Sequence, residues 1–140
     1  MLHAVIDTNV VVAALRSRLG ASFRLMERLA AREFRISLSV PLVLEYEDAG
    51  KRSAREVGLT ASDVDDVVDY LCSVADLREI HFLWRPFLRD PYDDHLLELA
   101  VESGSRWIIT FNIRDFAGSE RFGVEALTPQ QFLAKLEGRK

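Results

Sequence analysis

The chain has 140 residues, a net charge of −4 and a hydrophobic share of 49%. This length suits a single domain over residues 1–140 that buries a core without covalent cross-links, and the only cysteine, Cys72, excludes an internal disulfide. No stretch has the pattern of a signal peptide, and no apolar run approaches the roughly 20 residues that span a bilayer, so the sequence predicts a cytoplasmic protein without a membrane segment.

The first half of the chain alternates apolar runs with amphipathic stretches. The run that ends at Asp7 is typical of a strand buried on both faces. Helices are expected over residues 10–19 and 21–32, and a strand over residues 34–38. In the second helix the apolar stripe is formed by Phe23, Met26, Leu29 and Ala30. Pro41 then suits the first turn of a third helix.

The second half continues the alternation. Thr60 or Ser62 can cap a helix whose apolar positions are Val64, Val67, Val68, Leu71 and Val74. A strand near residues 77–82 precedes a helix that Gly104 ends, and strands over 107–110 and 124–127 precede a last helix at Thr128 and Pro129. Strands that alternate with helices predict an α/β fold, with three α/β/α layers and a mostly parallel central sheet.

Acidic residues follow the expected strands. Asp7 ends the first strand, Asp93 opens a helix, and Asp115 follows the strand that ends at Thr110. Glu45 lies one turn into a helix, within an otherwise apolar stretch. Because sites in parallel sheets form at the carboxyl ends of strands, we expect these four acids to share one crevice.

Each acid also has a purely structural interpretation, such as helix capping for Asp93 and Asp94 or a turn for Asp115. Together, however, carboxylates in one crevice repel each other, and a divalent cation removes that repulsion. Oxygen ligands suit Mg²⁺ or Mn²⁺ rather than zinc. The histidines, His3, His81 and His95, have no metal-ligand spacing and are interpreted as surface or packing residues.

Four short motifs resemble those of PIN-domain nucleases. They are Val5-Ile-Asp7-Thr8-Asn9-Val10, Leu44-Glu45-Tyr46, Asp90-Pro-Tyr-Asp93-Asp94, and Thr110-Phe-Asn112-Ile-Arg-Asp115-Phe116. Their order and spacing match across nearly the whole chain, whose length is similar to that of stand-alone PIN toxins of toxin–antitoxin pairs. The resemblance implies a PIN-like fold and a metal-dependent endoribonuclease.

The resemblance also implies residue roles. The metal ligands and catalytic acids would be Asp7, Glu45, Asp93 and Asp115, with Asp94 as the alternative third acid. Thr8 and Asn9 would orient Asp7 and its surroundings by hydrogen bonding, Asn112 would support or replace Asp115, and Asp90 would lie in an outer shell. Arg16, Arg18, Lys51 and Arg52 are candidates for contacts with the RNA backbone.

The same resemblance implies an antitoxin partner and a homodimer. The antitoxin would insert an Arg or Lys among the acids, with Leu15, Leu19, Phe23 and Met26 as possible apolar anchors, and the dimer would use the helix that follows Thr60 or its neighbours. Two alternatives stay open: a PIN fold that only binds or scaffolds, and a phosphatase of the haloacid-dehalogenase type. The phosphatase needs a general acid two residues after its nucleophile, where this chain has Asn9.

Overall fold

The computed structural model describes residues 1–80, 88 and 91–138. Its sheet has the strand order β3-β2-β1-β4-β5, and every neighbouring pair is parallel. The strands are β1 (His3–Ile6), β2 (Arg35–Leu38), β3 (Asp76–Leu77), β4 (Trp107–Ile109) and β5 (Glu125–Leu127). The expected strand near residues 77–82 is therefore shorter within the described residues, and residues 81 and 82 lie outside them.

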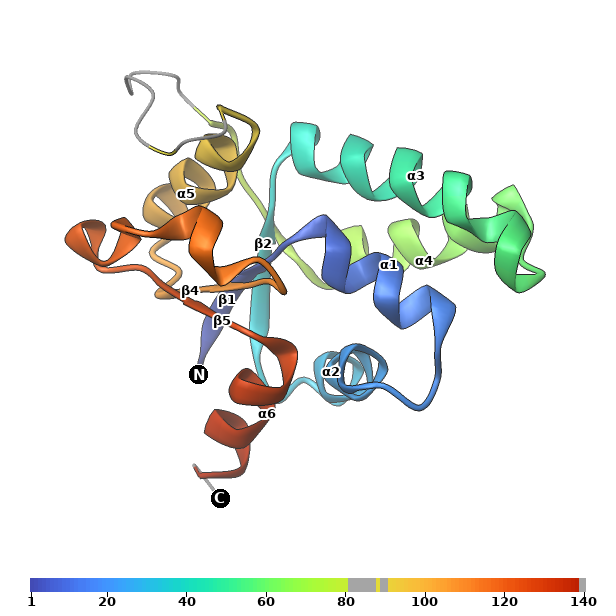
Figure 1. Cartoon of the computed structure of the whole chain (residues 1–140), viewed down its shortest axis with the longest axis horizontal. Coiled ribbons are helices and arrows are strands. Elements are labelled where there is room, and N and C mark those ends of the chain that lie inside the picture. The colour runs from blue at the N-terminus through green and yellow to red at the C-terminus, as the bar shows by residue number, and fades with distance from the viewer. Residues whose placement is uncertain (81–87, 89–90, 139–140) are drawn as a thin grey trace.

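Helices cover both faces of this sheet (Figure 1). On one side lie α1 (Thr8–Arg16), α2 (Ala21–Ala30), α3 (Val40–Ala54) and α4 (Ala61–Val74), and on the other α5 (Pro91–Ser103) packs on β1, β2 and β4. The last helix, α6 (Pro129–Glu137), packs against α2. Three short 3₁₀ helices complete the described elements: η1 (Arg55–Val57), η2 (Ile113–Phe116) and η3 (Ser119–Phe122). The three-layer α/β/α arrangement is confirmed, with a sheet that is parallel throughout.

Capping residues explain several helix boundaries. Ser39 and Thr60 accept hydrogen bonds from backbone N–H groups in the first turns of α3 and α4, and Thr128 does the same for α6. Thr60, rather than Ser62, is the cap of α4. Helix α1 begins at Thr8, earlier than expected, because the extended Asp7 is its N-cap and the Asp7 carbonyl already accepts from the Val10 N–H at 3.0 Å.

Two apolar faces differ from the expectations. The buried side of α2 consists of Ser22, Leu25 and Leu29, whereas Phe23 and Met26 are half-buried and Ala30 is exposed. The predicted stripe is therefore rotated about the helix axis relative to the buried side, and only Leu29 belongs to both. In α4 the positions Val64, Val68 and Leu71 are core residues of this same chain. They are not available as a dimer surface, because they already pack inside the domain.

Helix α3 packs closely against α1 and α4 at a glycine. Gly50 of α3 faces Val64 of α4 and Leu15 of α1, and a Cβ on it would lie 2.8 Å from a Val64 methyl carbon. The absence of a side chain lets α3 approach both neighbours closely. This packing fixes the position of α3, the helix that carries Glu45.

The end of α2 contains a residue in an unfavourable backbone conformation. Arg32 has φ 61°, and it closes the helix with Arg32 N–H to Leu29 C=O and Glu33 N–H to Arg28 C=O bonds of 2.9 and 3.1 Å. This is the Schellman arrangement, in which glycine is the usual left-handed residue. A Cβ in this conformation costs roughly 1 kcal/mol.

We expect Arg32→Gly to stabilise the folded chain by about 1 kcal/mol, because glycine adopts positive φ without that steric cost. Urea denaturation followed by circular dichroism measures the change. Arg32→Ala is the matched control, since it removes the same charge but keeps the Cβ. Equal stability of the two variants would show that the backbone conformation carries no penalty.

Candidate active site

The strand order changes direction between β1 and β4. From β1 the chain proceeds outward through β2 and β3, and it then returns to the other side of β1 as β4 and β5. Parallel sheets form their binding crevices at such a switch point, outside the carboxyl ends of the strands. A cleft of about 490 Å³ lies there. It is lined by Asp7, Thr8, Asn9, Val12, Ala49, Arg52, Ser53, Asp93, Asn112 and Asp115.

Asp7 lies directly beyond β1, beside the end of β4. Its backbone N–H donates to the carbonyl of Ile109, and its carboxylate accepts from the Thr110 hydroxyl at 2.8 Å. Burial raises the pKa of Asp7 above its ordinary value, and the charge of Glu45 adds to the rise. The bond from Thr110, a backbone bond from Thr8 and the nearby His95 act in the opposite direction. The negative charge of Asp7 is therefore disfavoured at this site, and a bound cation would stabilise it.

Thr110 is the centre of a small hydrogen-bond network. Its fully buried hydroxyl donates to Asp7, accepts from the Asn112 N–H at 2.9 Å, and lies 3.5 Å from the side-chain nitrogen of Asn9. Asn9 also accepts from the Phe111 N–H at 3.4 Å. Asn9 thus acts on Asp7 through Thr110. Thr110 was not among the predicted site residues, although its hydroxyl, which directly follows the apolar run of β4, was a usable signal.

Glu45 is held between two helices. One carboxylate oxygen accepts from the Thr8 hydroxyl of α1 at 2.8 Å, and the other lies 3.2 Å from His95 Nε2 of α5. Thr8 was expected to orient Asp7 and its surroundings; its backbone hydrogen-bonds to Asp7, and its hydroxyl orients Glu45. The neighbouring Tyr46 donates its hydroxyl to the Ile6 carbonyl, which joins α3 to the end of β1.

His95 was interpreted as a surface or packing residue. Its side chain is 11% exposed, which fits packing, and it also contacts Glu45 at 3.2 Å. Its position two residues after Asp93 gave no signal for this contact, because side chains two residues apart on a helix do not face the same side. His3 is different: it contacts Ser37 Oγ at 2.6 Å in the sheet, and His81 lies outside the described residues.

The two acids at the start of α5 face different surroundings. Asp93 lines the cleft, whereas Asp94 accepts a hydrogen bond from the Leu88 N–H at 2.8 Å, and both are buried. One turn later, Glu98 is also buried, and burial followed by the charge of Asp94 raises the pKa of Glu98. This geometry supports Asp93 as the third acid of the cleft. Asp90 lies outside the described residues.

The fourth acid comes from η2. Asp115 is exposed and lines the cleft together with Asn112, and its backbone N–H donates to the Asn112 carbonyl at 3.0 Å. The connection between these two residues is thus made by the backbone. Three of the four predicted acids line the cleft. Glu45 does not, but it accepts a hydrogen bond from Thr8, which lines the cleft.

The donor set of the cleft suits a hard cation. Asp7, Asp93, Asp115 and Asn112 present oxygen atoms, and the raised pKa of Asp7 reflects a carboxylate that lacks sufficient compensation. Within residues 1–80, 88 and 91–138, no three Asp, Glu, His or Cys side chains are close enough together to form a metal site as they stand. The residues therefore fit Mg²⁺ or Mn²⁺ in chemistry, and the bound arrangement stays a prediction.

Comparison with known proteins identifies the family of the chain. The sequence model of the family described as PIN domain matches residues 3–114. The chain belongs to the PIN domain family. This membership confirms the resemblance of the four motifs, supports a nuclease, and removes the support for a dehalogenase-type phosphatase. A comparison with curated proteins gives no significant match.

Solved structures share the fold of this PIN domain. VapBC2 from Rickettsia felis, crystallised with a DNA fragment from its promoter, has a TM-score of 0.59 at 14% identity, over 91% of this chain and 98% of that one. A domain of a functionally unknown protein from Methanocaldococcus jannaschii has a TM-score of 0.53 at 18% identity, over 91% of each chain. At such identities the likeness concerns the fold alone.

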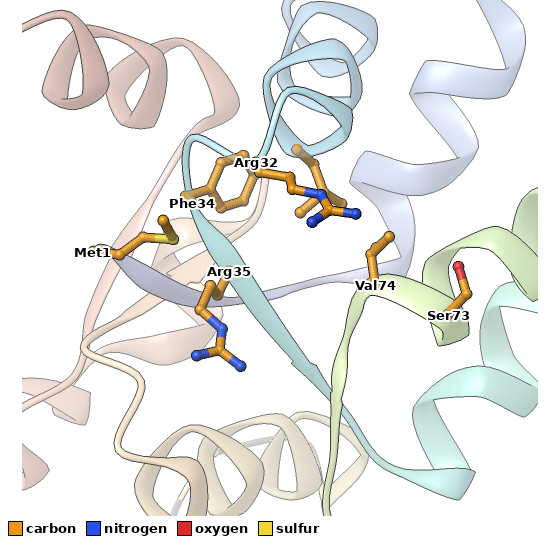
Figure 2. Close-up of a pocket in the computed structure, with 7 residues that line it drawn as sticks. Met1, Arg32, Phe34, Arg35, Ser73 and Val74 are labelled. Atoms are coloured by element: carbon orange, nitrogen blue, oxygen red, sulfur yellow. The ribbon is translucent and has the colours of Figure 1, made fainter.

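A second hollow of this PIN domain lies away from the acids (Figure 2). It encloses about 350 Å³ and is lined by Met1, Leu29, Arg32, Phe34, Arg35, Ser73 and Val74. In Figure 2 the guanidinium groups of Arg32 and Arg35 lie on either side of the β2 ribbon and do not converge. Because no carboxylate lines this hollow, it is not the predicted metal site.

The four basic residues expected to contact RNA lie at different distances from the acidic cleft of the PIN domain, and only Arg52 lines it. Arg52 lines the acidic cleft, and its side chain is 73% exposed, with an exposed ion pair of 3.4 Å to Asp48. Lys51 is bound to Glu47 and Asp65, and Arg16 to Glu56. Arg18 is exposed and does not line the cleft. Arg52 is thus the best placed of the four to meet a ligand in the cleft.

Among the described residues, none of the helices has both the length and the apolar character that a membrane crossing requires.

Proposed function

We propose that this chain is a divalent-metal-dependent endoribonuclease. The observation that carries the proposal is that Asp7, Asp93 and Asp115, from three separate segments, line one cleft at the switch point of the sheet. Several carboxylates in a shared crevice repel each other, and a bound cation compensates their charge. A site of this kind serves the hydrolysis of phosphodiesters, because the substrate is itself negatively charged.

The residues in and beside the cleft have two roles, which are metal binding and orientation of the metal ligands. Asp7, Asp93 and Asp115, together with Glu45, would hold Mg²⁺ or Mn²⁺, which when bound activates a water molecule and neutralises charge on the phosphate. Thr110 keeps the Asp7 carboxylate oriented. Thr8 holds Glu45 and, as the first residue of α1, follows Asp7 directly. Hydrolysis by an activated water needs no covalent nucleophile from the protein.

A cleavage assay tests this proposal. Labelled single-stranded RNA is incubated with the purified chain in Mg²⁺, in Mn²⁺, and in an excess of chelator. Products that appear only with metal support the proposal. A folded chain that binds RNA but never cleaves it would favour the alternative, a PIN fold that serves as a binding or scaffold module.

Arg52 is proposed to contact the phosphate backbone of RNA. We expect Arg52→Ala to weaken RNA binding and to reduce the slope of log Kd against log salt concentration by about 0.7, the value for one phosphate contact on a single strand. Fluorescence anisotropy in the Asp7→Asn background measures binding without cleavage.

Arg16→Ala is the matched control for this measurement. Like Arg52, Arg16 is exposed and paired with an acid, here Glu56, but it does not line the cleft, so its removal is expected to change RNA binding little. An unchanged salt slope for Arg52→Ala together with a reduced slope for Arg16→Ala would show that RNA approaches along another surface.

We also propose that the chain is the toxin of a toxin–antitoxin pair. The motifs of stand-alone PIN toxins and the fold shared with VapBC2, which was captured on promoter DNA, support an antitoxin partner. An Arg or Lys of that partner can supply positive charge in place of the metal, through charge-assisted hydrogen bonds with the acids. Of the expected anchors, Leu19 is 90% exposed, whereas Leu15, Phe23 and Met26 are half-buried. Co-purification with the product of an adjacent gene tests this pairing.

The homodimer stays a prediction. Since Val64, Val68 and Leu71 are core residues, its surface has to be formed by other parts of α4 or by neighbouring elements. Tyr70, which is 43% exposed on α4, is one such residue. Light scattering over a range of concentrations measures the association.

A further inference from the structure

The contact between His95 and Glu45 lies next to the cleft, because Glu45 also accepts a hydrogen bond from Thr8, which lines it. Glu45 belongs to α3, which lies on one face of the sheet, and His95 belongs to α5, which lies on the other. Their side chains are 8% and 11% exposed, and the distance from His95 Nε2 to the nearer Glu45 oxygen is 3.2 Å. The contact is therefore a buried bridge between the two helical layers, beside the carboxyl edge of the sheet.

The direction of this hydrogen bond follows from the chemistry of the two groups. A carboxylate oxygen accepts hydrogen bonds, so in the tautomer that carries a proton on Nε2, His95 donates to Glu45. The second oxygen of Glu45 accepts from Thr8, so both oxygens are fixed by donors on different helices. Each oxygen retains a further lone pair, which leaves the carboxylate able to bind a cation.

We propose that His95 is a positioning residue of the metal site, which fixes the Glu45 carboxylate toward the cleft by donating a hydrogen bond from Nε2. This inference rests on the proposed metal-dependent function. A Glu side chain has three rotatable bonds, and Thr8 alone restrains only one of its two oxygens. The second restraint, from His95, limits the remaining rotation of the carboxylate, so that less conformational freedom is lost when a cation binds.

The alternative is that His95 only fills space between α3 and α5. A packing role depends on the volume of the side chain, whereas a positioning role depends on a donor at the place of Nε2. His95→Leu keeps volume without a donor. His95→Gln places an amide N–H near the position of Nε2, and His95→Asn is shorter by one carbon and cannot reach Glu45.

Isothermal titration of the whole chain with Mn²⁺, without RNA, separates these roles. We expect His95→Leu to bind Mn²⁺ about 10- to 100-fold more weakly, the usual loss for a residue that orients a metal ligand, and His95→Gln to recover most of the affinity. In the Glu45→Gln background, His95→Leu is expected to cause little further loss, because the interaction it removes is already broken.

His3→Leu is the matched control. It also removes a partly buried histidine whose Nε2 makes a side-chain hydrogen bond, but His3 begins β1 and contacts Ser37 rather than Glu45. It should lower the melting temperature while leaving the Mn²⁺ affinity unchanged.

Several results would overturn the inference. Wild-type affinity in folded His95→Leu would do so, as would equal affinities of His95→Gln and His95→Asn, a comparison that remains usable if His95→Leu does not fold. Absence of Mn²⁺ binding by the wild-type chain would overturn the proposed function as well. Wild-type binding that Asp7→Asn abolishes but His95→Leu leaves intact would overturn only the role of His95.

Discussion

Asp7→Asn is expected to reduce metal-dependent RNA cleavage by more than about 100-fold while the fold is preserved. Residues that merely orient metal ligands cost about 10–100-fold when they are changed, so a ligand itself should cost more. Asparagine has nearly the same shape and can still accept the hydrogen bond of Thr110. Cleavage of labelled RNA in Mn²⁺ and circular dichroism of the same preparation measure activity and folding together.

The same substitution is expected to raise the melting temperature of the metal-free chain at neutral pH. Burial raises the folded-state pKa of Asp7, so ionisation of this group opposes folding. The destabilisation develops as the pH rises from the ordinary carboxyl pKa through the raised folded-state value, and it is complete above that value. The advantage of Asp7→Asn should therefore be largest at neutral pH and disappear in acid.

Thermal melts over a pH series, in excess chelator, test the stability half of this prediction. Undiminished cleavage by a folded Asp7→Asn variant would remove Asp7 from the metal site. A melting temperature below that of the wild type at neutral pH would instead show that the charge of Asp7 is compensated without metal.

The second large effect distinguishes two adjacent acids. We expect Asp93→Asn to abolish most cleavage, because Asp93 lines the cleft with Asp7 and Asp115. Asp94→Asn should keep activity close to that of the wild type. Asparagine can still accept from the Leu88 N–H, and the substitution removes a buried charge that lies close enough to raise the pKa of Glu98. Initial rates at saturating Mn²⁺, measured side by side, give the comparison.

The two variants are matched controls for each other, since they make the same chemical change at neighbouring buried positions in one helix. An inactive Asp94→Asn beside an active Asp93→Asn would show that the acids have exchanged roles. Equal, large losses would indicate that both carboxylates act at the cleft.

Much of the fold follows from local patterns. Short apolar runs separated by amphipathic stretches predict alternating strands and helices, and the chain has room for only a few arrangements of them. The acids at strand ends then follow from topology. Parallel strands end at one edge, which brings Asp7 and Asp115 together although they are far apart in the sequence.

Rotation about helix axes was harder to predict. Successive residues of a helix differ by about 100° in direction, so an error of one position exchanges a buried side for an exposed one. The face of α2 was misassigned for this reason, with Leu25 buried where Met26 was expected. At the start of α5 the same rotation separates Asp93 from Asp94, and there the expected register agrees with the cleft.

The sequence by itself determined the order of strands and helices, the PIN family motifs and the acids that those motifs contain. Only the tertiary structure decided which partners hold them: Thr110 for Asp7, and Thr8 with His95 for Glu45. These contacts join residues from different strands and helices. Their geometry depends on how closely the layers pack, as at Gly50, where α3 meets both α1 and α4. Periodicity assigns a residue to an element, but the distance between two elements is set by all the side chains between them.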